Sequence, residues 1–187
     1  METFGSSRAY LTSILFPYRV FADEIDKYQY LKTLKGTLEP LDCTGISFAL
    51  LDDQFTIATF SQRPGNDPGP QLLTSFQEKY LPMYIKRHPD CPAFFVNAGS
   101  TPIEEKSMLL QSALGVHFIP RDKGLVRHVE DYWWSSYQSY HGTYSWDFLD
   151  TTILLSMMGR RSRARRELYL YTKRLYEAQH QSAGDEL

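Results

Sequence analysis

The order of apolar and polar positions along the chain predicts alternating strands and helices. Alternating or continuous apolar runs between turn residues indicate strands, and apolar residues three and four apart indicate helices. We therefore expect strands at residues 8–15, 44–51, 54–60 and 93–98. We expect helices at residues 23–36, 71–87 and 101–114. This order predicts an α+β fold of the ferredoxin-like class, with helices packed on one face of a four-stranded antiparallel sheet.

Local signals define the ends of these helices. The first begins at Asp23, a favourable N-cap, and carries on one side the apolar residues Ile25, Tyr28, Leu31 and Leu34. Pro82 predicts an interruption of the second helix. Residues 101–104 combine a Thr cap, a Pro at the first helical position and a Glu three residues after the cap, which predicts the start of the third. Gly115 predicts its end.

The remaining pattern divides the chain into three parts. Residues 1–126 form the predicted domain. Residues 127–178 form an aromatic and Arg-rich helical appendage. Its last helix should dock on the domain through a stripe of apolar residues, namely Ala164, Leu168, Tyr171, Leu175 and Ala178. Residues 179–187 have the composition of a flexible tail.

Composition narrows the class of protein. Hydrophobic residues make up 42% of the 187 residues and aromatic residues 14%, so the chain can bury a core. It has neither a run of 18 apolar residues nor a signal-peptide pattern, so we expect no membrane span. The two cysteines, Cys43 and Cys91, make neither a metal cluster nor a disulfide framework. We therefore expect a cytoplasmic protein.

Charge is unevenly distributed. The chain has 20 basic and 22 acidic residues, and residues 159–174 hold seven of the basic residues but only one acid, Glu167. The rest keeps 13 basic and 21 acidic residues, a net charge of −8. A protein that binds a phosphate backbone usually has a basic excess on the binding face. In this chain only the last helix supplies one.

The second half of the chain carries a series of short motifs. They are Pro120, Gly124-Leu125-Val126, Trp134-Ser135-Ser136-Tyr137, Leu149-Asp150 and an Arg-rich run from Arg160 to Arg166. This series resembles the C-terminal part of the REP-associated tyrosine transposases. These are bacterial single-strand transposases with a His-hydrophobe-His nuclease domain. The resemblance implies the ferredoxin-like fold, single-stranded or hairpin DNA as partner and, in active members, a Mg²⁺ or Mn²⁺ ion.

The resemblance also locates the catalytic positions. In this family a tyrosine attacks a phosphate polarised by a metal ion, and two histidines on one strand face hold that metal. Alignment places the histidine positions at Gln54 and Thr56. Counting back from the Gly-Leu-Val turn places two tyrosine positions at Met108 and Gly115. None of the four is a good metal ligand or a nucleophile. We therefore expect no metal cofactor and no nicking, in a degenerate member of the family.

The Arg-rich run is the main nucleic-acid signal. The candidate DNA contacts are Arg160, Arg161, Arg163, Arg165, Arg166, Trp134 and Tyr137. The arginines would neutralise phosphates, and the rings, like those of Trp133, Tyr140 and Tyr144, would stack on unpaired bases. The alternative is a solvated basic face beside an aromatic core. Asn97 and Gly99 stand where the family has basic residues.

Four further candidates have structural explanations. Asp52 and Asp53 suit a hairpin turn, and Glu104 with Glu105 suits a helix start. His117 suits a hydrogen-bonded buried position. The adjacent serines, Ser135 and Ser136, have no local Asp or His partner and suit a capped turn anchored by aromatic rings.

Three hypotheses follow from the sequence. The protein is a DNA-binding protein derived from a transposase that has lost nicking activity. Alternatively, it is a protein-interaction or scaffold domain that has lost DNA binding as well. The third hypothesis is an active transposase with a divergent site. We favour the first, while the protein partner and the oligomeric state stay open.

Overall fold

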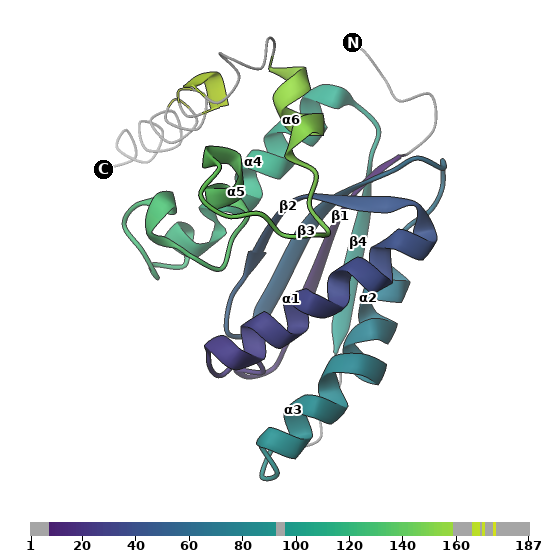
Figure 1. Ribbon diagram of the computed structural model, residues 1–187, viewed down its shortest axis with the longest axis vertical. Coiled ribbons are helices and arrows are strands. Elements are labelled where there is room, and N and C mark those ends of the chain that lie inside the picture. Colours follow the sequence, from purple (N-terminus) through teal and green to yellow (C-terminus); the bar gives the residue numbers. More distant parts are fainter. Residues whose placement is uncertain (1–7, 93–95, 159–165, 169, 171–173, 175–187) are drawn as a thin grey trace, which may run out of the picture.

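The computed structural model describes residues 8–92, 96–158, 166–168, 170 and 174. Its centre is a four-stranded antiparallel sheet in the order β2-β3-β1-β4 (Figure 1). The strands are β1 (Ala9–Leu15), β2 (Cys43–Leu50), β3 (Gln54–Ser61) and β4 (Asn97–Ile103). This strand order, with helices between β1 and β2 and between β3 and β4, confirms the ferredoxin-like α+β class.

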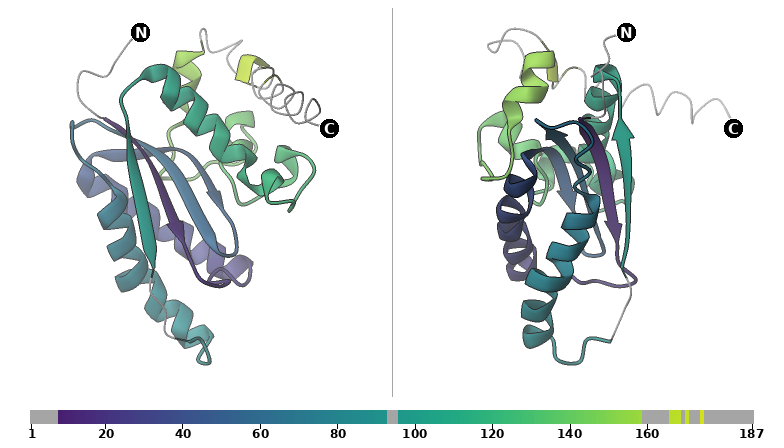
Figure 2. Two further views of the ribbon diagram at one scale, coloured as in Figure 1. Left: turned by 180° about the vertical axis from the view of Figure 1, so that it is seen from behind. Right: turned by 90° about the vertical axis from the view of Figure 1, so that its right-hand side faces the viewer.

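Helices cover both faces of the sheet. Helix α1 (Glu24–Leu38) lies on one face beside a second rod, which consists of α2 (Gly69–Ser75), the π-helical turn η2 (Phe76–Tyr80) and α3 (Leu81–Arg87). Helix α4 (Lys106–Asp122) crosses the opposite face (Figure 2). The helices α1 to α3 therefore pack on one face as predicted, whereas α4, which corresponds to the third predicted helix, packs on the opposite face.

Strand alternation separates two cores. Phe55 and Ile57 of β3 join the aromatic core under α1, whereas Ala58 joins the core under α4. A bulge in β2 between Gly45 and Ser47 changes the side on which the following residues point. Ile46 therefore packs toward α4, while Phe48 packs toward α1.

The predicted apolar side of α1 is correct only in its second half. Leu31 and Leu34 are buried, but Ile25 and Tyr28 are exposed. Asp26 is buried in their place. Its carboxylate pairs with Arg87 and with His88 Nε2 (2.9 Å), both at the end of the α2–α3 rod. Ion pairing with a distant segment makes burial of this carboxylate tolerable, and apolar periodicity carries no information about it.

The interruption predicted at Pro82 is confirmed. The residues before it, Phe76–Tyr80, form the π-helical turn, and Pro82 lies in the first turn of α3, where its missing N–H is harmless.

The predicted fourth strand is present but extends further along the chain than residues 93–98, and the predicted helix start at residues 101–104 is wrong. Residues 93–95 lie outside the described residues, and β4 begins at Asn97. Thr101, Pro102 and Ile103 pair with Leu11, Tyr10 and Ala9 of β1. Strand pairing outweighs the capping signal here, and an edge strand tolerates a proline.

The predicted end of this helix at Gly115 is also wrong, because α4 continues to Asp122. Gly115 lies on the exposed side of the helix, while buried neighbours such as Leu114 and Val116 hold the helix on the sheet. The helix ends at Gly124, whose φ of +73° favours glycine.

The segment after α4 packs along the free edge of β2. It contains the short helices η3 (Val129–Asp131), α5 (Tyr137–His141) and α6 (Thr151–Met157). Backbone N–H groups of Leu50 and Gly45 donate to the carbonyls of Trp134 (2.8 Å) and Phe148 (2.8 Å). Leu168 is buried in the core under α4. This agrees with the predicted docking of the last helix, although the rest of its apolar stripe lies outside the described residues.

No helix in the described ranges is long and apolar enough to cross a membrane.

Two neighbouring core tyrosines give opposite predictions for stability. The rings of Tyr30 and Tyr80 lie 5.4 Å apart. The Tyr80 hydroxyl donates to the Val20 carbonyl (2.7 Å), whereas the buried Tyr30 hydroxyl has no hydrogen-bond partner among the described residues. Tyr80→Phe should lower the free energy of unfolding by about 1–3 kcal/mol, and Tyr30→Phe should raise it by about 1 kcal/mol. Urea denaturation measures both, and equal destabilisation by the two variants would contradict this.

Candidate nucleic-acid interface

Gln54 and Thr56 lie on the sheet face that α4 partly covers. They alternate with Phe55, which points into the opposite core, so both side chains point to the same face as predicted. The Gln54 amide Nε2 donates to Thr56 Oγ1 (3.0 Å), and Thr56 Oγ1 hydrogen-bonds Ser13 Oγ (2.9 Å). The three polar side chains therefore satisfy one another in a chain of neutral hydrogen bonds.

Neighbouring strands extend this face. In the register of the sheet, Ser13 pairs with Thr56 and Gly99, and Leu15 pairs with Gln54 and Asn97. Directly paired residues in an antiparallel sheet point to the same side. We call the set made of Ser13, Leu15, Gln54, Thr56, Asn97 and Gly99 the open sheet face; Leu15, Asn97 and Gly99 are exposed, whereas Thr56 is buried. It contains no ionisable side chain. Oxygen and nitrogen atoms of neutral side chains are poor substitutes for the imidazoles or carboxylates that hold a divalent metal.

Met108 and Gly115 lie on the outer side of α4. Both are exposed, whereas Leu109, Ala113 and Val116 form the side that packs on the sheet. The structure therefore does not bring these two positions onto the open sheet face.

The described residues contain one cluster with the composition of a metal site, and it lies elsewhere. Ligand atoms of Asp23, Asp26 and His88 come within 4.8 Å of one another. The Arg87 guanidinium already occupies the cluster, donating to Asp23 Oδ2 (2.7 Å) and to Asp26. This pairing lowers the pKa of Asp23 to about 2. The cluster joins the start of α1 to the end of α3. Sequence reasoning missed it, although the Arg-His pair that ends α3 is a visible signal.

Three further candidates, Asp52, Ser135 and Ser136, have structural partners. Asp52 lies at the turn between β2 and β3 and pairs with Arg19 (2.5 Å) and Lys27 (2.6 Å). Ser136 Oγ accepts from the Phe48 N–H (2.8 Å), and Ser135 Oγ donates to the Tyr132 carbonyl (3.2 Å).

His117 is fully buried beneath the appendage. Its Nε2 hydrogen-bonds Ser136 Oγ (2.7 Å), and its ring contacts the rings of Tyr137 and Tyr140. Burial, with a smaller contribution from His141, lowers the pKa of His117 to about 3. The imidazole is therefore neutral at physiological pH and joins α4 to the appendage.

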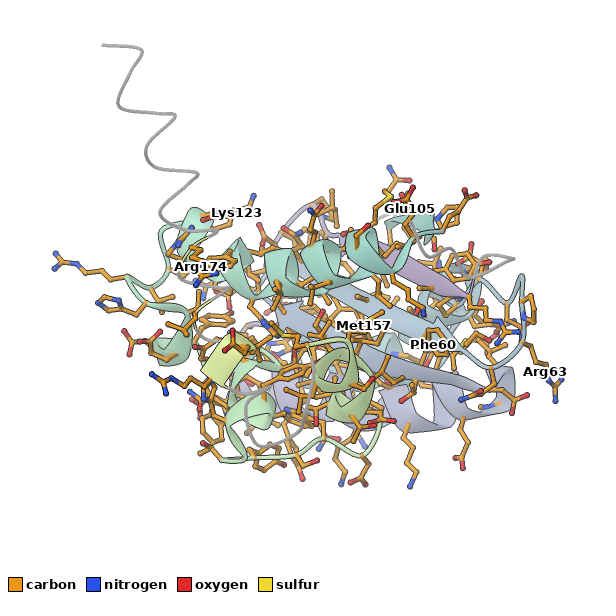
Figure 3. All side chains as sticks on the ribbon, turned by 90° about the horizontal axis from the view of Figure 1, so that it is seen from above. Phe60, Arg63, Glu105, Lys123, Met157 and Arg174 are labelled. Atoms are coloured by element: carbon orange, nitrogen blue, oxygen red, sulfur yellow. The ribbon has the colours of Figure 1, made fainter. Side chains whose placement is uncertain are left out.

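Only some of the candidate DNA contacts lie within the described residues. Arg160, Arg161, Arg163 and Arg165 lie outside the described residues. Arg166 is exposed, as expected for a residue off the apolar stripe that contains the buried Leu168. In Figure 3, seen from above, the labelled Lys123 and Arg174 lie toward the same end of the molecule.

The two aromatic candidates are less accessible than a stacking role requires. Tyr137 is only 3% exposed, with its ring against His117 and His141. Its burial supports the aromatic-core alternative. Trp134 is half-buried, and the ammonium of Lys27 lies 5.9 Å from its ring centroid. The exposed rings of this segment are instead Trp133 and Tyr144.

Comparison with solved structures identifies the fold. The chain is similar to a REP-associated tyrosine transposase whose structure contains a bound REP hairpin. The TM-score is 0.56 at 10% sequence identity, over 81% of this chain and 91% of that chain. No protein-family model matches the sequence, and no curated protein sequence is significantly similar to it. The fold is therefore transposase-like, as the sequence motifs implied.

The buried imidazole predicts a pH-dependent stability. The unfolded chain binds a proton at His117 below about pH 6.5 and the folded chain does not until about pH 3, so stability falls as the pH falls through this window. Between pH 7 and pH 5 this group should lower the free energy of unfolding by about 2 kcal/mol. Urea denaturation of the parent and of His117→Gln at both pH values measures the difference.

The matched control is His128→Gln, because His128 is exposed. This variant should retain the pH dependence of the parent, and His117→Gln should lose most of it. A His117→Gln variant with the parent's pH dependence would show that His117 is not the titrating group.

Proposed function

We propose that this protein binds single-stranded or hairpin DNA and lacks the tyrosine nicking activity of the transposases that it resembles. The observation that carries the second half of this proposal is the neutral open sheet face. A nuclease of this kind needs two imidazoles on alternate residues of one strand. Gln54 and Thr56 stand there, hydrogen-bonded to each other and to Ser13.

The nucleophile argument is independent of the metal argument. Neither Met108 nor Gly115 has an atom that attacks phosphorus. Both also lie on the outer side of α4. The site therefore lacks the metal ligands and the nucleophile together, and a single divergent residue does not restore the reaction.

The DNA-binding half of the proposal has different support. The fold is similar to that of a transposase whose structure contains a hairpin. The sequence concentrates positive charge at residues 159–174, and within this range the described Leu168 is buried against the body while Arg166 is exposed. A basic face held on a folded body is the arrangement that phosphate contacts require. The competing scaffold function draws its support from the net charge of −8 in the rest of the chain.

The first prediction concerns chemistry. Incubation with a labelled DNA hairpin and Mn²⁺ should give no covalent adduct on a denaturing gel, because no tyrosine stands at either nucleophile position. An active tyrosine transposase with its own hairpin is the positive control. A protease-sensitive band of the combined size of protein and DNA would establish the alternative of an active transposase with a divergent site.

The second prediction concerns the Arg-rich run. Arg161→Ala with Arg165→Ala should weaken binding to all DNA sequences by a similar factor. It should also lower the slope of log K against log salt by about 0.7–0.9 for each lost phosphate contact. Fluorescence anisotropy across a salt series measures both quantities.

The control is a double variant that loses the same charge, Arg19→Ala with Arg63→Ala. These two arginines pair with Asp52 and Asp42. These are exposed ion pairs on other segments, so this double variant should bind DNA like the parent. If the parent binds no hairpin at low salt, or if the Arg161/Arg165 variant binds as well as the parent, the scaffold function replaces the DNA-binding one.

A further inference from the structure

The exposed aromatic side chains of the described residues lie in one row. These residues are Trp133 (49% exposed), Tyr144 (39%) and Tyr28 (42%). The ring centroids of Trp133 and Tyr144 are 5.8 Å apart, those of Tyr144 and Trp146 are 5.0 Å apart, and those of Trp146 and Tyr28 are 6.2 Å apart. We call these four residues the aromatic row. Exposed aromatic residues scattered singly over a surface need no explanation, but here Trp133 and Tyr144 are in contact and the buried Trp146 joins them to Tyr28.

Core packing and backbone hydrogen bonds hold the segment that carries the aromatic row. Trp146 is buried at its base against Phe48 (6.0 Å between centroids) and Phe148 (6.2 Å). Backbone hydrogen bonds attach Trp134, next to Trp133, and Phe148 to β2. The segment between α5 and α6 passes beside α1 at the β2 side of the sheet (Figure 1). The exposed rings are therefore presented by anchored backbone, which favours recognition because little ordering remains to be done on binding.

A positive charge accompanies the row. The Lys32 ammonium lies 5.4 Å from the Tyr28 ring centroid. Among the described residues Lys32 has no carboxylate within ion-pairing distance, whereas Lys27, next to Trp134, is neutralised by Asp52. A row of π faces with an uncompensated cation beside it fits a chain of unpaired nucleotides, whose bases stack and whose phosphates carry the negative charge.

We propose that the aromatic row binds unpaired nucleotides of a DNA strand, independently of base sequence. This inference rests on the proposed DNA-binding function and extends it to a second surface. Tyr28 belongs to α1, on the opposite side of the sheet from the open sheet face. The aromatic row contains none of the arginines proposed to contact phosphates, so contacts to phosphates and to unpaired bases fall on different residues and respond to different substitutions.

The test compares a short oligothymidine with a blunt DNA duplex, both fluorescently labelled, by anisotropy at low salt. Trp133→Ala and Tyr144→Ala should each weaken oligothymidine binding about 5- to 100-fold and leave duplex binding unchanged. Trp133→Phe keeps a π face and should retain most of the affinity. The control is Met83→Ala, which removes an exposed apolar side chain on α3. Circular dichroism verifies that each variant is folded.

The outcomes separate this inference from the function on which it rests. If the parent binds hairpin or duplex DNA but not oligothymidine, or if the Trp133 and Tyr144 variants bind oligothymidine like the parent, the aromatic row is not a nucleotide site and the proposed function stands. If the parent binds no DNA of any kind, both fall together. In either case a protein partner becomes the occupant to seek for the aromatic row.

Discussion

The structure depends on how the edge of β2 is closed. An edge strand exposes a line of unpaired N–H and C=O groups, and these must be covered or paired. Here the segment after α4 supplies the partners: the backbone groups of Trp134 and Phe148, and the hydroxyls of Tyr132 and Tyr140, which donate to the carbonyls of Leu50 (2.8 Å) and Ile46 (2.5 Å). Close approach requires Gly45, because a Cβ there would lie 3.1 Å from the Phe148 carbonyl and ring. The appendage is thus part of the sheet's hydrogen bonding.

The residues that stabilise the fold lie apart from the open sheet face. The groups that hold the molecule together lie at the β2 edge, in the aromatic core under α1 and in the contact of His117 with Ser136. None of them belongs to the open sheet face. Gln54, Thr56 and Ser13 form a chain of hydrogen bonds there and belong to neither apolar core. The side chains on this face can therefore differ in chemistry without removing a contact of either core.

Sequence reasoning predicted the structural features that depend on neighbouring residues. It failed for the features that depend on contacts between segments far apart in the sequence. Strands β1 to β3, the Asp23 cap and the break at Pro82 follow from apolar alternation, a capping side chain and a missing N–H. The start of α4 could not be predicted, because the capping signal at Thr101 competes with the pairing of Thr101 with Leu11 of β1, 90 residues earlier in the chain. The burial of Asp26 was not predicted for the same reason, since its partner Arg87 lies 61 residues away. Strand alternation correctly predicted that Gln54 and Thr56 point to the same face of the sheet. No sequence pattern predicted the hydrogen bond between Thr56 and Ser13.

Three of the motifs that resemble the transposases contain a residue with a structural role in this chain. Gly124 takes a positive φ that ends α4, and its N–H donates to the Arg121 carbonyl (2.8 Å). Ser136 binds both β2 and His117, and Asp150 caps α6 by accepting from the Thr152 N–H (2.8 Å). In this chain these residues act on the fold and not on a reaction. Their presence therefore bears on the architecture, whereas function depends on the side chains that the architecture leaves on its surfaces.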